Sequence, residues 1–139
     1  MSAVKSGGQG KVARPLSPHL QVYAMTVSMM MSILHRITGA SLYVGAPLLA
    51  AWLIAAAMGP DAYGMVTGLL GTTLGQIVLV GFTWALVHHA LGGIRHFIWD
   101  FGIGYDLETV DLMAWSTIVV SVLVTAGIWA LILFGFGAP

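Results

Sequence analysis

Ionisable side chains at the end of an otherwise apolar segment are the part of this chain best suited to chemistry. The segment runs from His89 to Asp100 and reads HALGGIRHFIWD. A charge at membrane depth is costly, and one that is kept there usually serves a function. On a helix that turns about 100° per residue, His89, Gly93, His96 and Asp100 share one face.

A histidine beside a surface without side chains can accept a large planar ligand. Gly92 and Gly93 lie one turn beyond His89 and remove side-chain bulk there. Haem ligated by histidine fits this arrangement. It equally fits a close approach of two helices at the glycines, with His89 hydrogen-bonded across the interface. The spacing alone leaves both interpretations open.

The other ionisable side chains of the segment are interpreted differently. His88 is rotated by about 100° from the glycine face, so we expect it to bond to a neighbouring helix. Arg95, His96 and Asp100 lie closer to the membrane surface, and we expect them to form an interfacial charge network. In a transport protein, the same three side chains are the alternative candidates for a proton relay.

A second polar group lies in the first third of the chain. Ser32 and Arg36 are four residues apart and share a helix face, and His35 lies close by. Arginine offers five donors that suit a haem propionate or a carbonyl oxygen, and serine can donate a hydrogen bond to a quinone carbonyl. The alternative for Arg36 is an anchor whose charged end reaches water.

The composition indicates a membrane protein. Hydrophobic residues make up 58% of the 139 residues and charged residues only 7%, whereas soluble domains carry about 25% charged residues. Five Lys and Arg residues are too few for a phosphate-binding surface, which excludes nucleic acid as a partner. The sequence has no cysteine, which excludes disulfides and Fe–S ligation in this chain.

Three apolar segments predict an all-α integral membrane protein, because each reaches the roughly 20 residues that a spanning helix needs. We expect a polar N-terminal arm at 1–27 and one transmembrane domain at 28–136. Pro47 should kink the first span, and Gly59-Pro60-Asp61 should begin a loop. The three helices are expected at about 28–58, 66–98 and 112–136.

The positive charges predict the orientation. All five of them precede or begin the first span or lie near the end of the second, at Lys5, Lys11, Arg14, Arg36 and Arg95. Three spans place them on one side, so the N-terminus should face inside and the C-terminus outside. The arm lacks the apolar region of a signal peptide. We expect a bacterial inner membrane, with the mitochondrial inner membrane as the alternative.

Two motifs, in this order on a chain of this length, resemble those of one protein family. The first comprises RPLSPHL at 14–20 and SILHRITG at 32–39, and the second is HxxxGIRHxxWDxG at 89–102. The chain resembles the cytochrome b subunit of succinate dehydrogenase (respiratory complex II), the larger of its two small membrane anchors.

The resemblance implies a role for each matching residue. His89 takes the position of an axial ligand to the iron of haem b, and the other axial histidine comes from the second anchor subunit. His35 and Arg36 match positions that approach the haem propionates. Ser32 and Arg36 match positions that line the ubiquinone pocket, which the iron–sulfur subunit and the other anchor complete.

The resemblance also implies a place in the tricarboxylic acid cycle and the respiratory chain. Electrons from succinate would pass from a flavoprotein subunit through iron–sulfur clusters to ubiquinone. FAD, the Fe–S clusters and the dicarboxylate site would belong to partner subunits. Three alternatives stay open: a haem-free structural anchor of the same complex, a small proton-coupled transporter subunit, and haem ligation by His35 and His89 within one chain.

Overall fold

Helices make up almost all of the chain that the structure describes. The computed structural model describes residues 24–135, and this range contains helices and short connections but no strand. Three helices are long and apolar enough to cross a membrane, which confirms the predicted all-α fold with three spans. The helices are α1 (Val27–Met58), α2 (Pro60–Leu70), α3 (Thr73–Asp100) and α4 (Leu107–Ala130), and α4 continues as the π-helical turn η1 (Leu131–Gly135).

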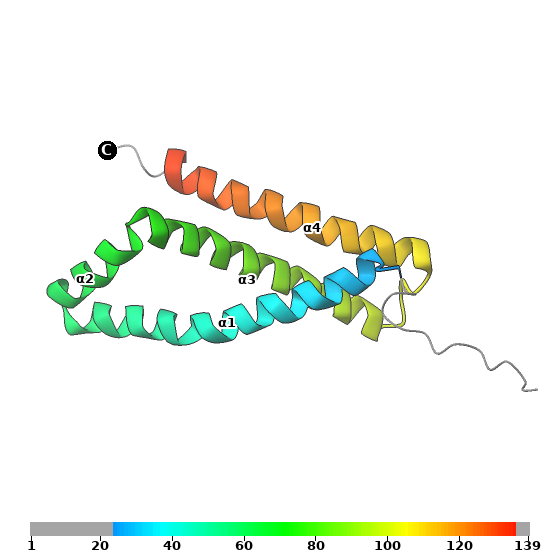
Figure 1. The fold of residues 1–139 in the computed structure, drawn as a ribbon, viewed down its shortest axis with the longest axis horizontal. Coiled ribbons are helices and arrows are strands. Elements are labelled where there is room, and N and C mark those ends of the chain that lie inside the picture. Colours follow the sequence, from blue (N-terminus) through cyan, green and yellow to red (C-terminus); the bar gives the residue numbers. More distant parts are fainter. Residues whose placement is uncertain (1–23, 136–139) are drawn as a thin grey trace, which may run out of the picture.

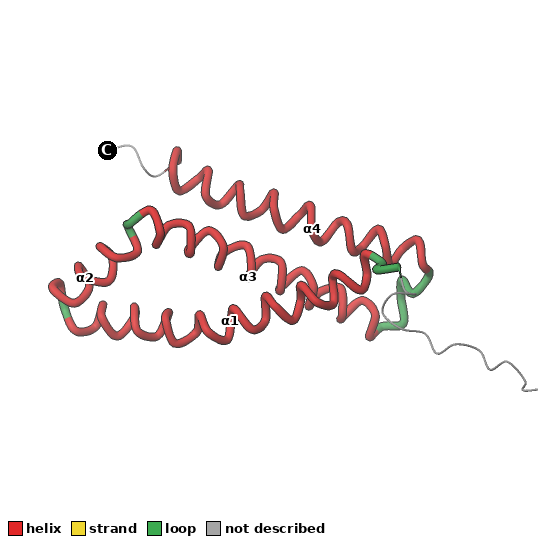
Figure 2. Tube along the Cα trace, in the orientation of Figure 1, coloured by secondary structure: helices red, strands yellow, loops and turns green. Residues whose placement is uncertain are grey.

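The three spans run alternately up and down. α3 packs against both α1 and α4, and α1 also contacts α4 (Figure 1). The start of α1, the end of α3 and the start of α4 lie at one end of the molecule, whereas α2 lies at the other end (Figure 1). Figure 2 shows that only short loops join these helices. Of the polar arm predicted at 1–27, all but residues 24–27 lies outside the described range.

Two expectations about the first connection are wrong. Gly59-Pro60-Asp61 begins the short helix α2 and not a loop. Gly59 ends α1 with φ 115°, a backbone conformation that suits glycine, and Pro60 then starts α2 at a position where its missing N–H is not needed. The second span, expected from 66, begins only at Thr73, because Thr72 caps α3 by accepting a hydrogen bond from Gly75 N at 3.1 Å.

The first span, α1, agrees with the expected 28–58, whereas the third span differs at its start. α1 continues through Pro47 as one helix up to Met58. α4 begins at Leu107, before the expected start at 112, because the Asp106 carboxylate accepts a hydrogen bond from Thr109 N at 2.8 Å and caps the helix. An N-cap of this kind can start a helix ahead of its apolar run, so hydrophobicity alone placed this start too late.

Few apolar side chains are buried between the helices. The buried hydrophobic residues are Met31, Ala55, Ala85 and Ala114, while large apolar side chains point outward along all three spans. This pattern suits a lipid environment, where an apolar exterior carries no penalty and helices associate through small residues and polar contacts.

The interface between α3 and α4 is built from such contacts. One stripe of α4 is buried and carries only small side chains: Ala114, Thr117, Ser121 and Thr125. Ser121 donates a hydrogen bond to Ile118 O, which leaves its oxygen free to accept one from His88 Nδ1 at 3.2 Å. The expected bond from His88 to a neighbouring helix is thereby confirmed.

Replacing Ser121 by Ala is expected to destabilise the chain. The change leaves the buried imidazole of His88 without its partner on α4, and hydrogen bonds between membrane helices are worth about 0.6 to 1.7 kcal/mol. Thermal unfolding in detergent should therefore begin at a lower temperature. Ser116→Ala is the matched control, because that hydroxyl is exposed and bonds only to its own helix at Met113 O. Equal stability of the two variants would contradict this role of Ser121.

Candidate functional site

α1 and α3 bring three histidines together where they cross. The rings of His35 and His89 are stacked, with centroids 4.0 Å apart and planes 7° apart. His96, two turns further along α3, places its ring centroid 5.3 Å from that of His35. The prediction that His89 and His96 share a face of α3 is confirmed, because both contact the same side chain of α1.

His89 is held by two oxygens of α1. Its Nδ1 lies 3.1 Å from the backbone oxygen of His35 and 3.3 Å from the hydroxyl of Thr38. A carbonyl oxygen can only accept, so Nδ1 carries the ring hydrogen. A neutral imidazole has one N–H, and Nε2 of the half-buried His89 is therefore the nitrogen with a free lone pair.

Two glycines make room for the stacked rings. A Cβ atom at Gly92 would lie 2.5 Å from His35 Nδ1, and one at Gly39 would lie 2.9 Å from His89 Cε1. A Cβ atom at Gly93 would meet no atom of residues 24–135 within 4 Å. The glycine surface predicted beside His89 is thus divided: Gly92 is filled by α1, and only Gly93 stays open.

The charge network expected from Arg95, His96 and Asp100 does not form within residues 24–135. Arg95 is only 5% exposed, and its guanidinium carbon lies 5.0 Å from the centre of the Trp99 ring. Asp100 is exposed. Five residues on a helix correspond to a rotation of about 140°, so Arg95 and Asp100 point in different directions.

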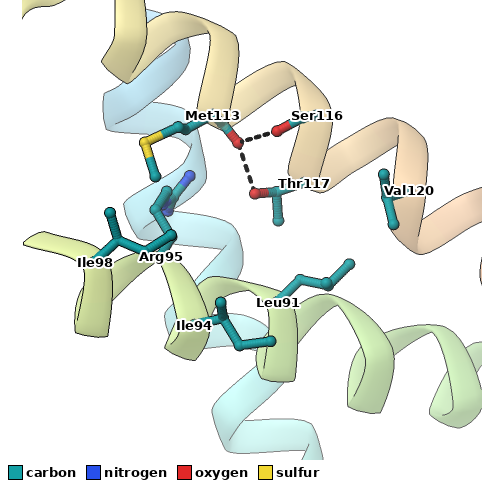
Figure 3. Close-up of a pocket in the computed structure, with 8 residues that line it drawn as sticks. All are labelled: Leu91, Ile94, Arg95, Ile98, Met113, Ser116, Thr117 and Val120. Atoms are coloured by element: carbon teal, nitrogen blue, oxygen red, sulfur yellow. Dashed lines mark hydrogen bonds between the residues drawn. The ribbon is translucent and has the colours of Figure 1, made fainter. Parts of the chain in front are cut away.

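Arg95 is buried where α3 packs against α4. It lies beside a groove of about 160 Å³ between α3 and α4, next to Met113 and Thr117 (Figure 3). Both neighbouring hydroxyls of α4, on Ser116 and Thr117, donate to Met113 O (Figure 3). Arg95 therefore belongs to the packing of α3 on α4.

Ser32 and Arg36 lie on the outer surface of α1, next to the histidine cluster. Both side chains are exposed, and neither forms a hydrogen bond with any other residue between 24 and 135. They share a face of α1 as predicted, one turn apart. The described part of the chain therefore leaves their polar groups available to a molecule outside its own helices.

Thr38 and Gly39 are the site residues that the sequence analysis missed. They stand three and four residues after His35, so helical spacing could have placed them one turn further along the same face. Their importance depends on contacts with His89, which lies 51 residues from Thr38 in the sequence. Periodicity within one helix carries no information about such a partner.

Comparison with known proteins identifies the family. Residues 11–128 match the family described as succinate dehydrogenase/fumarate reductase transmembrane subunit. The chain belongs to this family.

The similarity to individual succinate dehydrogenase subunits covers most of the chain. A cytochrome b556 subunit from Paracoccus denitrificans is 41% identical over 109 residues, which are 78% of this chain and 84% of the relative. One from Rickettsia felis is 35% identical over 116 residues, 84% of this chain and 90% of the relative. A mitochondrial cytochrome b560 subunit from Sus scrofa is 34% identical over 120 residues, 85% of this chain and 71% of the relative.

Family membership and the three spans establish the setting of the histidine cluster. The chain is a membrane anchor of complex II, and as a subunit of an oxidoreductase complex it has partner subunits. It is a multi-pass protein of the bacterial inner membrane. Both helices that form the cluster fall within the matched residues.

Substituting Gly92 by Ala is expected to disrupt the cluster. The added methyl group would overlap His35, and overpacking of this kind costs about 1 to 3 kcal/mol. The unfolding temperature of the purified chain in detergent should fall. Gly93→Ala is the neighbouring control: the added methyl group meets no atom of the described residues within 4 Å, so the substitution should leave this temperature unchanged or raise it. Equal loss in both variants would show that the close approach at Gly92 is unimportant.

Proposed function

We propose that this chain is the cytochrome b anchor of a succinate:quinone oxidoreductase. In this role it binds haem b jointly with a second anchor subunit and contributes to the ubiquinone-reduction site. The observation that carries the proposal is the hydrogen bonding of His89. Its Nδ1 is hydrogen-bonded to the His35 carbonyl and the Thr38 hydroxyl of α1, while its Nε2 has a free lone pair. The relatives named as cytochrome b subunits support the same assignment.

The residues present fit a haem better than a bare metal ion. Residues 24–135 contain no group of three His, Asp or Glu side chains that could hold an ion. The porphyrin supplies four nitrogens to its own iron, so a single histidine from this chain suffices as an axial ligand. The open surface at Gly93, four residues from His89, offers space for a planar group or a partner helix.

The geometry favours a second axial ligand from the other anchor over one from His35. Two axial ligands must point at each other across the iron. His35 and His89 instead lie in nearly parallel planes with their centroids 4.0 Å apart, and since the lone pair of a ring nitrogen lies in the plane of its ring, the two histidines could not bind one iron from opposite sides. His35, together with the exposed Arg36, would then hold the haem propionates.

A haem with two histidine ligands has no open coordination position, so it would transfer or store electrons without binding oxygen. This chain would keep Nε2 of His89 directed at the iron. Burial of the haem between the two anchors would add contact area that helps to hold them together.

Ser32 and Arg36 would bind the quinone in the proposed ubiquinone-reduction site. The hydroxyl and the guanidinium would hold one quinone oxygen and stabilise the negative charge that develops on it during reduction. Because both side chains are exposed on this chain, the rest of the pocket would come from the iron–sulfur subunit and the other anchor. FAD and Fe–S clusters in the partner subunits would supply the electrons.

The charge distribution supports the orientation with the N-terminus inside. Arg36 lies in the first third of α1 and Arg95 near the end of α3. The start of α1 and the end of α3 lie at the same end of the molecule (Figure 1). Under the positive-inside rule this end faces the interior, and the quinone would be reduced there.

The competing functions have less support. A proton relay through Arg95, His96 and Asp100 would need these side chains to be connected, yet Arg95 is buried toward α4 and Asp100 points away from it. A haem-free anchor would leave Nε2 of His89 without a role. A dithionite-reduced minus oxidised spectrum of the purified complex separates the haem-free anchor from our proposal. The haem-free anchor predicts that no b-type band is present, whereas our proposal predicts one.

Replacing His89 by Ala is expected to remove or severely loosen the haem, because the iron loses an axial ligand. The measurement is haem content, with the low-spin spectrum of the purified complex. His88→Gln is the control in the adjacent position: glutamine can still donate to Ser121, and the haem should be retained. An unchanged low-spin spectrum in the His89→Ala complex would refute the ligand assignment.

Ser32→Ala and Arg36→Ala are expected to depress succinate:ubiquinone reductase activity by roughly tenfold or more, since each removes a donor to the quinone oxygen. Succinate oxidation with an artificial acceptor that bypasses the quinone site should continue at the rate of the unmodified complex. Equal loss of both activities would point to failed assembly and would contradict a loss specific to the quinone step.

A further inference from the structure

Thr38 has a buried hydroxyl group that contacts polar atoms of its own helix and also one on a neighbouring helix. It is 2% exposed and lies within α1. Its Oγ1 is 2.9 Å from Leu34 O and 3.0 Å from His35 O, which is the usual way for a threonine inside a helix to bond its own backbone. The additional approach to His89 Nδ1, at 3.3 Å, joins it to α3.

The direction of these bonds follows from what each atom can do. The Thr38 hydrogen is donated to a carbonyl of α1, which turns a lone pair of its oxygen toward His89. The second oxygen near Nδ1 is the His35 carbonyl, at 3.1 Å, which only accepts. Nδ1–H of His89 therefore donates to two acceptors at once, and this holds the ring in the tautomer with a free Nε2.

The surrounding packing keeps the ring from rotating. One face of the His89 ring is covered by His35. Its Cε1 edge lies against Gly39, where a Cβ atom would be 2.9 Å away. The two acceptors on α1 thus act on a ring that is already confined, so they determine where Nε2 points.

We propose that Thr38 is a positioning residue for the haem ligand: its hydroxyl, with the His35 carbonyl, fixes the orientation and donor strength of His89 toward the haem iron. The inference rests on the haem assignment proposed above. A hydrogen bond from the far nitrogen of a ligating imidazole makes the other nitrogen a stronger donor. Stronger donation favours the oxidised iron, so loss of the Thr38 acceptor raises the haem reduction potential.

The test uses the purified whole complex and three substitutions. Thr38→Val keeps the shape but removes the oxygen, Thr38→Ser keeps the oxygen but removes the methyl group, and Thr38→Ala removes both. The haem midpoint potential and the electron paramagnetic resonance spectrum of the ferric haem are measured in each. We expect an upward shift of the potential and a changed g-value pattern in the valine and alanine variants, and values of the unmodified complex in the serine variant.

Each outcome decides the question. If the valine and alanine variants lose their haem while the serine variant keeps it, the hydroxyl is required to hold the ligand, which supports the proposal. A valine variant with unchanged potential and spectrum overturns it, as does a serine variant that changes as valine does. Failure of the haem assignment itself is recognised separately, by the absence of a b-type band in the unmodified complex.

Discussion

The crossing of α1 and α3 at His35 and His89 is the contact on which the site depends. It brings a backbone carbonyl and a hydroxyl of one helix within hydrogen-bond reach of an imidazole on the other. Gly39 and Gly92, one on each helix, permit this approach, because any larger residue would collide with a histidine ring. The same contact leaves one nitrogen of His89 free, so a packing interaction also prepares a ligand.

A lipid environment explains why polar contacts have this prominence. Apolar side chains gain little by leaving lipid for the interior of a bundle, so burial of hydrophobic surface does not specify how the spans dock. Large apolar residues accordingly cover the outside, and apart from Met31 the residues buried between the spans are small or polar. His88 with Ser121 joins α3 to α4 in the way that His89 with Thr38 joins α3 to α1.

Helical periodicity predicted some features of the site and failed on others. It placed His89 and His96 on one face of α3, and Ser32 and Arg36 on one face of α1. It failed for Gly92, which was expected to leave an open surface beside the ligand as Gly93 does but is filled by His35 of α1, and for the Arg95–Asp100 network. Both features depend on which helix packs against which side of α3. Adjacent residues of α3 can face different neighbours, and periodicity within one helix does not show which neighbour each residue meets.

The amino-acid sequence by itself determined the membrane setting, the three spans, the family and the residues able to bind a ligand. These properties follow from composition, segment length and local spacing, all of which can be read from the amino-acid sequence alone. The tertiary structure alone decided the tautomer of His89, the role of Thr38 and the direction of Arg95. Each of these depends on a contact between residues far apart in the chain, and the relative rotation of two packed helices sets that contact.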